Sequence, residues 1–131
     1  MPFNENIIFE NVSFSYPSAR AKIVLNEVNF TIPNGSRVGV IGLTGGGKST
    51  LLDIVMGLLL PTHSHIMIDG IKITRANQNS WRKLITHVPQ SVFLSDSSVA
   101  ENIAFGIPKK DIDMQRVIQA AKKANYMKKL C

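Results

Sequence analysis

Two segments near the N-terminus alternate hydrophobic and polar residues with the period of a β-strand. In the first segment, Val12, Phe14 and Tyr16 share one face. In the second segment, residues 24–32, the hydrophobic face contains Val28, Phe30 and Ile32. Strict alternation of this kind predicts half-buried strands.

The middle of the chain changes its hydrophobic period. The apolar run over residues 37–41 predicts a short buried strand, and the helical spacing of apolar residues over 49–60 predicts a helix that ends at Pro61. Residues 66–73 predict a β-hairpin, because an Asp-Gly pair at 69–70 is typical of a tight turn between two strands.

The last third of the chain predicts mostly helix. Residues 81–85 are expected to form one or two helical turns that lead into a short strand at 87–89. A final helix is expected to run to about Leu130, with either Asp111 or Asp113 as its N-cap. The apolar stripe of that helix would consist of Val117, Ala121, Ala124 and Met127.

The composition fits one globular domain. The chain has 131 residues, of which 44% are hydrophobic and 18% are charged, and its single cysteine is Cys131. These values argue against disorder and against a disulfide framework, and a lone thiol fits a reducing compartment. No apolar run approaches the roughly 20 residues of a membrane-spanning helix.

The positive charge gathers in the C-terminal segment. The net charge is +6, and residues 107–131 hold 7 Lys or Arg against 2 Asp or Glu. Nucleic-acid binders usually interleave such charge with aromatic residues or spread it over a face. We therefore expect a solvated helix face here and no nucleic-acid partner.

The strongest chemical signal is a glycine-rich loop between the strand expected at 37–41 and the helix expected at 49–60. Residues 42–49 match the phosphate-loop pattern G-x-x-x-x-G-K-[ST] at every fixed position. Glycines let the backbone turn several N–H groups towards an anion, and the helix N-terminus adds partial positive charge. Lys48 would reach the outer phosphates, and the Ser49 hydroxyl would ligate Mg²⁺. The sequence therefore predicts binding of a nucleoside triphosphate.

Further segments of the sequence indicate which family of nucleotide-binding proteins the chain resembles. Over residues 6–125 the chain resembles the nucleotide-binding domain of ATP-binding cassette (ABC) transporters, through its phosphate loop, the phrase at residues 9–16 and the phrase at 66–70. The resemblance implies that the ligand is ATP with Mg²⁺ and that Tyr16 stacks on the adenine. It also implies that Asp69 belongs to an antiparallel hairpin and not to the Walker B magnesium site. The implied ATP-binding residues are Tyr16, Gly42, Thr44, Gly45, Gly46, Gly47, Lys48, Ser49 and Thr50.

Two later elements resemble the exporter-type branch of this family. Residues 87–90 are similar to the Q-loop, which implies that Gln90 contacts Mg²⁺ or the attacking water and senses a transmembrane partner. The Glu-Asn-Ile element at 101–103 is similar to the surface that receives a coupling helix. The sequence Phe-Leu-Ser-Asp at residues 93–96 looks most like that of bacterial exporters of glycans or lipid-linked oligosaccharides.

The resemblance implies an α/β fold. We expect an incomplete P-loop NTPase core with an antiparallel β subdomain and the start of a helical subdomain. The expected divisions of this single, truncated domain are an antiparallel part over 1–35, the P-loop core to the Q-loop over 36–90 and the helical start over 91–131. The implied partners are a transmembrane domain and a second nucleotide-binding domain, most simply a second copy of this chain, at the cytoplasmic face of a membrane.

Several family motifs do not occur in the sequence. There is no Leu-Ser-Gly-Gly-Gln signature, no Walker B aspartate followed by glutamate, and no switch histidine. We therefore expect negligible ATP hydrolysis by this chain alone. Two alternatives stay open, which are a non-hydrolysing nucleotide-binding module and an ABC-type ATPase that is not linked to transport. Small GTPases are weaker still, since no Asn-Lys-x-Asp guanine motif occurs.

Overall fold

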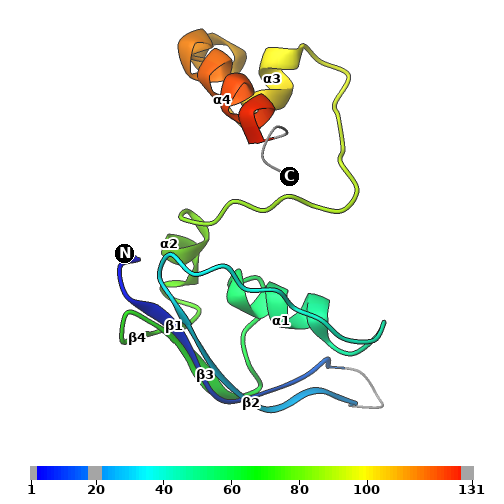
Figure 1. Ribbon diagram of the computed structural model, residues 1–131, viewed down its shortest axis with the longest axis vertical. Helices are drawn as coiled ribbons and strands as arrows, with labels where there is room; N and C mark the ends of the chain where they lie inside the picture. The colour runs from blue at the N-terminus through cyan, green and yellow to red at the C-terminus, as the bar shows by residue number, and fades with distance from the viewer. Residues whose placement is uncertain (1–2, 18–21, 128–131) are drawn as a thin grey trace. The chain divides into compact units, whose positions relative to one another are not determined.

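The computed structural model describes residues 3–17 and 22–127, which fall into two compact units. The first unit is Met1–Thr86 and the second is His87–Cys131. Each unit has its own helices, and the sheet belongs to the first (Figure 1).

The first unit is built on a four-stranded sheet with the order β2-β1-β3-β4 (Figure 1). Its strands are β1 (Asn6–Ser15), β2 (Ile23–Pro33), β3 (His63–Ile68) and β4 (Ile71–Lys72). Each neighbouring pair is antiparallel. This arrangement confirms the strands expected from the alternation at both N-terminal segments.

The core of this unit lies between the sheet and helix α1 (Lys48–Val55). Val12 and Phe14 of β1 are buried as predicted, and Ile54 of α1 is fully buried against them in the same cluster. Phe9 stacks on its cross-strand partner Phe30, with ring centroids 4.3 Å apart. Pairs of this kind stabilise a sheet, so this contact stabilises the pairing of β1 with β2, while β3 pairs with the other edge of β1.

Helix α1 ends five residues before the predicted position. It stops at Val55, because Gly57 adopts a left-handed conformation with φ +67° and turns the chain away. The short helix α2 (Gln78–Arg82) then covers this end. The Trp81 indole donates to the carbonyl of Val55 at 2.7 Å, and the Arg82 Nε donates to that of Gly57 at 2.8 Å. Two carbonyls at this end of the helix are thereby satisfied by side chains.

Two predicted strands are wrong. Residues 37–41 form neither helix nor strand, and Val38 and Ile41 are 58% and 95% exposed. Residues 87–89, in the second unit, are also irregular, and Val88 is exposed. A strand needs a neighbour to hydrogen-bond with, and in the part of the chain that the structure describes no strand pairs with either segment.

The hairpin predicted at residues 66–73 is confirmed. β3 and β4 pair with Met67 opposite Lys72, and both turn residues have positive φ, +49° at Asp69 and +73° at Gly70. This is the backbone of a type I′ turn, which an Asp-Gly pair favours.

The second unit contains α3 (Val99–Ile103), the 3₁₀ turn η1 (Lys109–Asp111) and α4 (Met114–Met127). Asp113 caps α4, since its carboxylate accepts the backbone N–H groups of Gln115 and Arg116 at 2.9 and 3.2 Å. This resolves the choice between the two aspartates in favour of Asp113. In the expected apolar stripe Val117 is buried and Ala121 and Ala124 are exposed, while the side chain of Met127 is not among those described. Leu130, the predicted end of the helix, lies outside the described residues.

Candidate functional site

The glycine-rich loop leads directly into the first turn of α1. Gly42, Gly45 and Gly47 have φ values of +155°, +81° and +82°, which reverse the backbone repeatedly before the helix begins. Gly47 is the N-cap, and no side chain caps this end of α1. Its first N–H groups therefore have no side-chain acceptor, and this is the arrangement that binds phosphate at helix N-termini.

Gly47 is required for two separate reasons. Its left-handed φ is unfavourable for other residues. A Cβ atom there would also lie 3.0 Å from the Val24 carbonyl oxygen and 3.0 Å from Leu25 Cδ2. The loop is thus seated directly on strand β2.

Lys48 folds its side chain back over the loop. Its ammonium group donates to the carbonyl oxygens of Gly42 and Leu43, at 2.7 and 2.6 Å. The amide of Gly46 also bonds to the Leu43 carbonyl, at 3.1 Å. These hydrogen bonds join the two ends of the loop and hold the lysine charge against its backbone.

The two hydroxyl residues after Lys48 differ in environment. Ser49 is exposed, so its hydroxyl is free to reach a ligand, whereas Thr50 is only 5% exposed. Thr44, Gly45 and Gly46 are exposed on the loop. An exposed hydroxyl beside the helix N-terminus fits Mg²⁺, which prefers oxygen ligands.

Tyr16 is brought to the start of α1 from the end of β1. Its phenolic oxygen lies 3.1 Å from Thr50 Oγ1, and its ring packs edge-on against Phe14 with centroids 4.9 Å apart. Tyr16 is 45% exposed. The aromatic residue expected to stack on a base therefore lies beside the expected phosphate site. The contact with Phe14 agrees with the shared face predicted from the alternating pattern. The hydrogen bond to Thr50 was not predicted, because a contact across 34 residues leaves no local pattern.

Asp69 forms hydrogen bonds that hold the N-terminal segment and makes no contact with the candidate site. Its carboxylate accepts the backbone N–H groups of Asn4, Glu5 and Asn6 at 2.7 to 3.0 Å. Desolvation raises the pKa of Asp69, but the three hydrogen bonds together outweigh it and leave the pKa below its usual value. These contacts confirm that Asp69 is a hairpin residue.

Gln90 belongs to the second unit. It is exposed and lies in a segment without helix or strand. Its role at Mg²⁺ stays a prediction.

The Glu-Asn-Ile element lies on α3 in a hydrogen-bonded cap. The backbone N–H of Glu101 donates to the Ser98 hydroxyl at 3.3 Å, and the Glu101 carboxylate accepts the Ser98 N–H at 3.0 Å. The Ser98 hydroxyl is the largest cause, ahead of the Ser98 N–H, of a lowered pKa at Glu101. Asn102 accepts the N–H of Ser95 at 2.9 Å and so fixes the preceding loop. This cap was not predicted, although the Ser-x-x-Glu spacing of Ser98 and Glu101 is the sequence pattern that indicates it.

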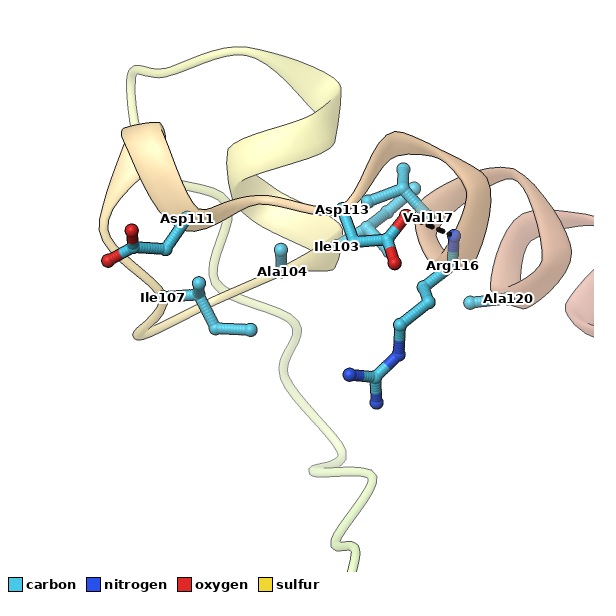
Figure 2. Close-up of a pocket in the computed structure, with 8 residues that line it drawn as sticks. All are labelled: Ile103, Ala104, Ile107, Asp111, Asp113, Arg116, Val117 and Ala120. Atoms are coloured by element: carbon cyan, nitrogen blue, oxygen red, sulfur yellow. Dashed lines mark hydrogen bonds between the residues drawn. The ribbon is translucent and has the colours of Figure 1, made fainter.

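A small cavity adjoins this element (Figure 2). It has a volume of about 200 Å³ and lies between α3, η1 and α4, with Ile103, Ile107 and Val117 among its apolar lining residues. Asp113 and Arg116 also line it from the start of α4. The lining is mostly apolar with charge at its edge.

Among residues 3–17 and 22–127, no helix has the length and hydropathy that a bilayer crossing needs. Within the same residues, no group of three or more His, Cys, Asp or Glu side chains is arranged to hold a metal.

Comparison with known proteins places these features in a family. Residues 25–131 match the family model described as "ABC transporter". The chain is 41% identical over 119 residues to the ABC multidrug transporter mdr2 of Aspergillus fumigatus, covering 91% of this chain and 15% of that protein. It is 39% identical over 116 residues to the ATP-dependent lipid A-core flippase of Cupriavidus metallidurans, covering 88% of this chain and 19% of the relative. The chain therefore spans less than a fifth of the length of either relative.

The fold agrees with these matches. A bacterial Atm1-family ABC exporter solved with ATP bound superposes with a TM-score of 0.72 at 33% identity, covering 83% of this chain and 19% of the exporter. This confirms the expected α/β class with an incomplete P-loop core. The names of the relatives refer to different cargoes, so the similarity points to the exporter branch and not to one substrate. The chain belongs to the ABC transporter family, as part of an exporter-type nucleotide-binding domain.

Proposed function

We propose that this chain binds ATP with Mg²⁺ through the loop formed by residues 42–49. The observation that carries the proposal is the N-terminus of α1, which has no side-chain cap and follows a loop that also holds the Lys48 ammonium group through the carbonyls of Gly42 and Leu43. A helix N-terminus without a side-chain cap and a lysine ammonium group in the same loop suit an anion with several oxygens.

Each side chain of the site has one role in this proposal. Lys48 leaves the carbonyls of Gly42 and Leu43 and moves its charge to the outer phosphates. The Ser49 hydroxyl ligates Mg²⁺. The Tyr16 ring stacks on the adenine, since an aromatic face supplies affinity to a purine without base-specific hydrogen bonds. Gln90 of the second unit supplies an amide oxygen to Mg²⁺ or to the attacking water.

In the whole protein, we propose that ATP binding and hydrolysis drive export across a membrane. The partners are a transmembrane domain and a second nucleotide-binding domain, and the site operates at the cytoplasmic face. The apolar cavity beside Ile103 supports a docking role for the Glu-Asn-Ile element, because an exposed apolar hollow with a charged edge suits a protein partner (Figure 2). The resemblance at residues 93–96 is to bacterial exporters of glycans or lipid-linked oligosaccharides, and in this family the transmembrane segments choose the cargo.

The chain by itself is proposed to bind ATP without hydrolysing it at a measurable rate. Phosphoryl transfer depends on groups that position water and stabilise charge around the outer phosphate. The signature and Walker B motifs that supply such groups in the family do not occur in this sequence. The proposed domain divisions remain 1–35, 36–90 and 91–131.

Calorimetric titration with Mg-ATP tests the proposal. The chain is compared with Lys48→Ala and with the matched control Lys83→Ala, which removes an exposed lysine of the same unit. We expect saturable binding by the unaltered chain and by Lys83→Ala, and at least tenfold weaker binding by Lys48→Ala. Equal binding by all three proteins, or none by the unaltered chain, would contradict the proposal.

A further inference from the structure

Residues 3–6 form a strap at the start of the first unit, and three of its backbone N–H groups share one acceptor. Asn4, Glu5 and Asn6 all donate to the carboxylate of Asp69, at 2.7 to 3.0 Å, from the turn between β3 and β4. The bonds from Asn4 and Glu5 are exposed to solvent. A short segment that depends on an exposed carboxylate can open locally while the sheet stays folded.

The other contacts of the strap are hydrogen bonds to Asn34 and one aromatic contact. The Asn34 N–H donates to the carbonyl of Glu5 at 2.7 Å, and its side-chain amide donates to the carbonyl of Asn4 at 3.0 Å. The Phe3 ring packs edge-on against Trp81, with centroids 5.7 Å apart. Trp81 is only 3% exposed. The seated strap therefore places an aromatic ring directly against a buried side chain of α2.

Trp81 joins the strap to the helix that carries the candidate phosphate site. Its indole donates to the Val55 carbonyl at 2.7 Å, and its Cδ1 would lie 3.2 Å from a Cβ atom at Gly57. The indole thus lies against the turn that ends α1. This helix has eight residues, so it is about 12 Å long, and it contains no proline or glycine that could absorb a bend. A displacement at Val55 would therefore also move Lys48 at the other end.

We propose that the strap controls the affinity of the phosphate site for Mg-ATP. Seated on Asp69 and Trp81, it holds α1 in the position that binds the nucleotide, and its release lets the end of the helix move and weakens binding. This inference rests on the proposed function. Because such coupling is reciprocal, bound Mg-ATP also favours the seated strap. A pull on residues 3–6 would then lower the affinity for ATP.

Calorimetric titration of variants that release the strap with Mg-ATP tests this coupling. Phe3→Ala removes the aromatic contact with Trp81, and Asp69→Gly removes the carboxylate at a position whose φ of +49° glycine tolerates. Asp69→Asn retains an oxygen that accepts hydrogen bonds, so its affinity should lie between those of Asp69→Gly and the unaltered chain. The control is Phe30→Ala, which removes the stacking on Phe9 and leaves the hydrogen bonds of the strap in place.

All titrations are made at a temperature at which urea unfolding shows each variant to be folded. We expect Phe3→Ala and Asp69→Gly each to bind Mg-ATP roughly two- to tenfold more weakly than the unaltered chain, at the low end of typical couplings. Phe30→Ala should lower the urea midpoint without changing the affinity. Unchanged affinity in either strap variant, or equal weakening by Phe30→Ala, would overturn the coupling and leave the strap a purely structural element.

Hydrogen exchange of the unaltered chain gives a second test that needs no substitution. With saturating Mg-ATP, the amides of Asn4 and Glu5 should exchange more slowly, by a factor similar to the loss of affinity in the strap variants. The amide of Asn11, which donates to the Asn29 side chain at 2.8 Å outside the strap, should keep its rate. A segment that opens independently of the ligand site keeps its exchange rate. Unchanged rates at Asn4 and Glu5, or equal slowing at Asn11, would therefore also overturn the coupling.

The two proposals can fail separately in these measurements. If the unaltered chain binds Mg-ATP and neither the strap variants nor the strap amides respond, the coupling fails and the proposed function stands. If the unaltered chain does not bind Mg-ATP, the proposed function fails and the coupling fails with it.

Discussion

The indole Nε1 of Trp81 donates a hydrogen bond to the backbone carbonyl of Val55, at a distance of 2.7 Å. This bond joins α2 to the end of the helix whose other end forms the candidate phosphate site. Phe3 packs edge-on against the same indole, with ring centroids 5.7 Å apart. The helix that carries the site is therefore held by a side-chain contact at its far end.

We expect Trp81→Phe to destabilise the first unit by about 1 to 3 kcal/mol. The smaller ring keeps part of the apolar contact but leaves the Val55 carbonyl without its partner in a partly buried position. Urea unfolding followed by far-UV circular dichroism measures the change, since the variant has no tryptophan to report by fluorescence. Asn79→Ala, at an exposed position of α2, is the control and should unfold like the unaltered chain. A loss of equal size in both variants would contradict the helix-end role of the indole.

The features that the sequence predicted correctly have causes within a few residues of each other. The turn at 69–70 follows from an Asp-Gly pair, and the cap was predicted to be one of two nearby aspartates, of which the structure uses Asp113, directly before the helix. The phosphate loop is likewise a contiguous motif, and its glycine at 47 has the positive φ that such a loop needs.

The errors have causes that are not local in the sequence. The apolar run at 37–41 was expected to be a buried strand, but burial and hydrogen bonds would come from neighbouring strands that are absent from the described sheet. The helix expected to reach residue 60 ends early because Gly57 turns under Trp81, 24 positions later. The link between Tyr16 and Thr50 also required the folded structure.

Two glycines of the loop allow backbone strain to be separated from steric contact. Gly45 and Gly47 have nearly the same φ, +81° and +82°, but a Cβ at Gly45 would meet nothing within 4 Å whereas one at Gly47 would lie 3.0 Å from the Val24 carbonyl oxygen. We expect Gly45→Ala to cost about 1 to 2 kcal/mol, the strain of a left-handed residue. Gly47→Ala should cost about 1 kcal/mol more, because β2 must shift. Urea unfolding of both variants provides the comparison, and equal losses would show that the close approach to β2 is unimportant.

The carboxylate of Asp69 should make stability depend on pH in the acid range. Its three backbone hydrogen bonds lower the pKa in the folded state despite desolvation, so the folded chain binds fewer protons than the unfolded chain. The stabilisation is complete above the unfolded pKa of about 4 and is lost as pH falls through the lower folded value. The free energy of unfolding, measured across this range, should fall less steeply with acid in Asp69→Asn than in the unaltered chain. Glu5→Gln removes an exposed charge nearby and should keep the original slope. The same slope in Asp69→Asn would refute the assignment.

We expect substitutions of the two aspartates before α4 to differ in their effect on the stability of that helix. The carboxylate of Asp113 accepts two backbone N–H groups in the first turn, whereas Asp111 lies in η1, one turn earlier. Asp113→Ala should therefore destabilise the helix by about 1 kcal/mol, the usual cost of removing an N-cap. Asp113→Asn should recover much of this loss, because an amide oxygen also accepts these bonds. Helicity at 222 nm and thermal unfolding measure the effect, with Asp111→Ala as the matched control that removes the same charge. If Asp111→Ala lowers helicity as much as Asp113→Ala, the contribution comes from negative charge near the helix start and not from the cap that the structure shows.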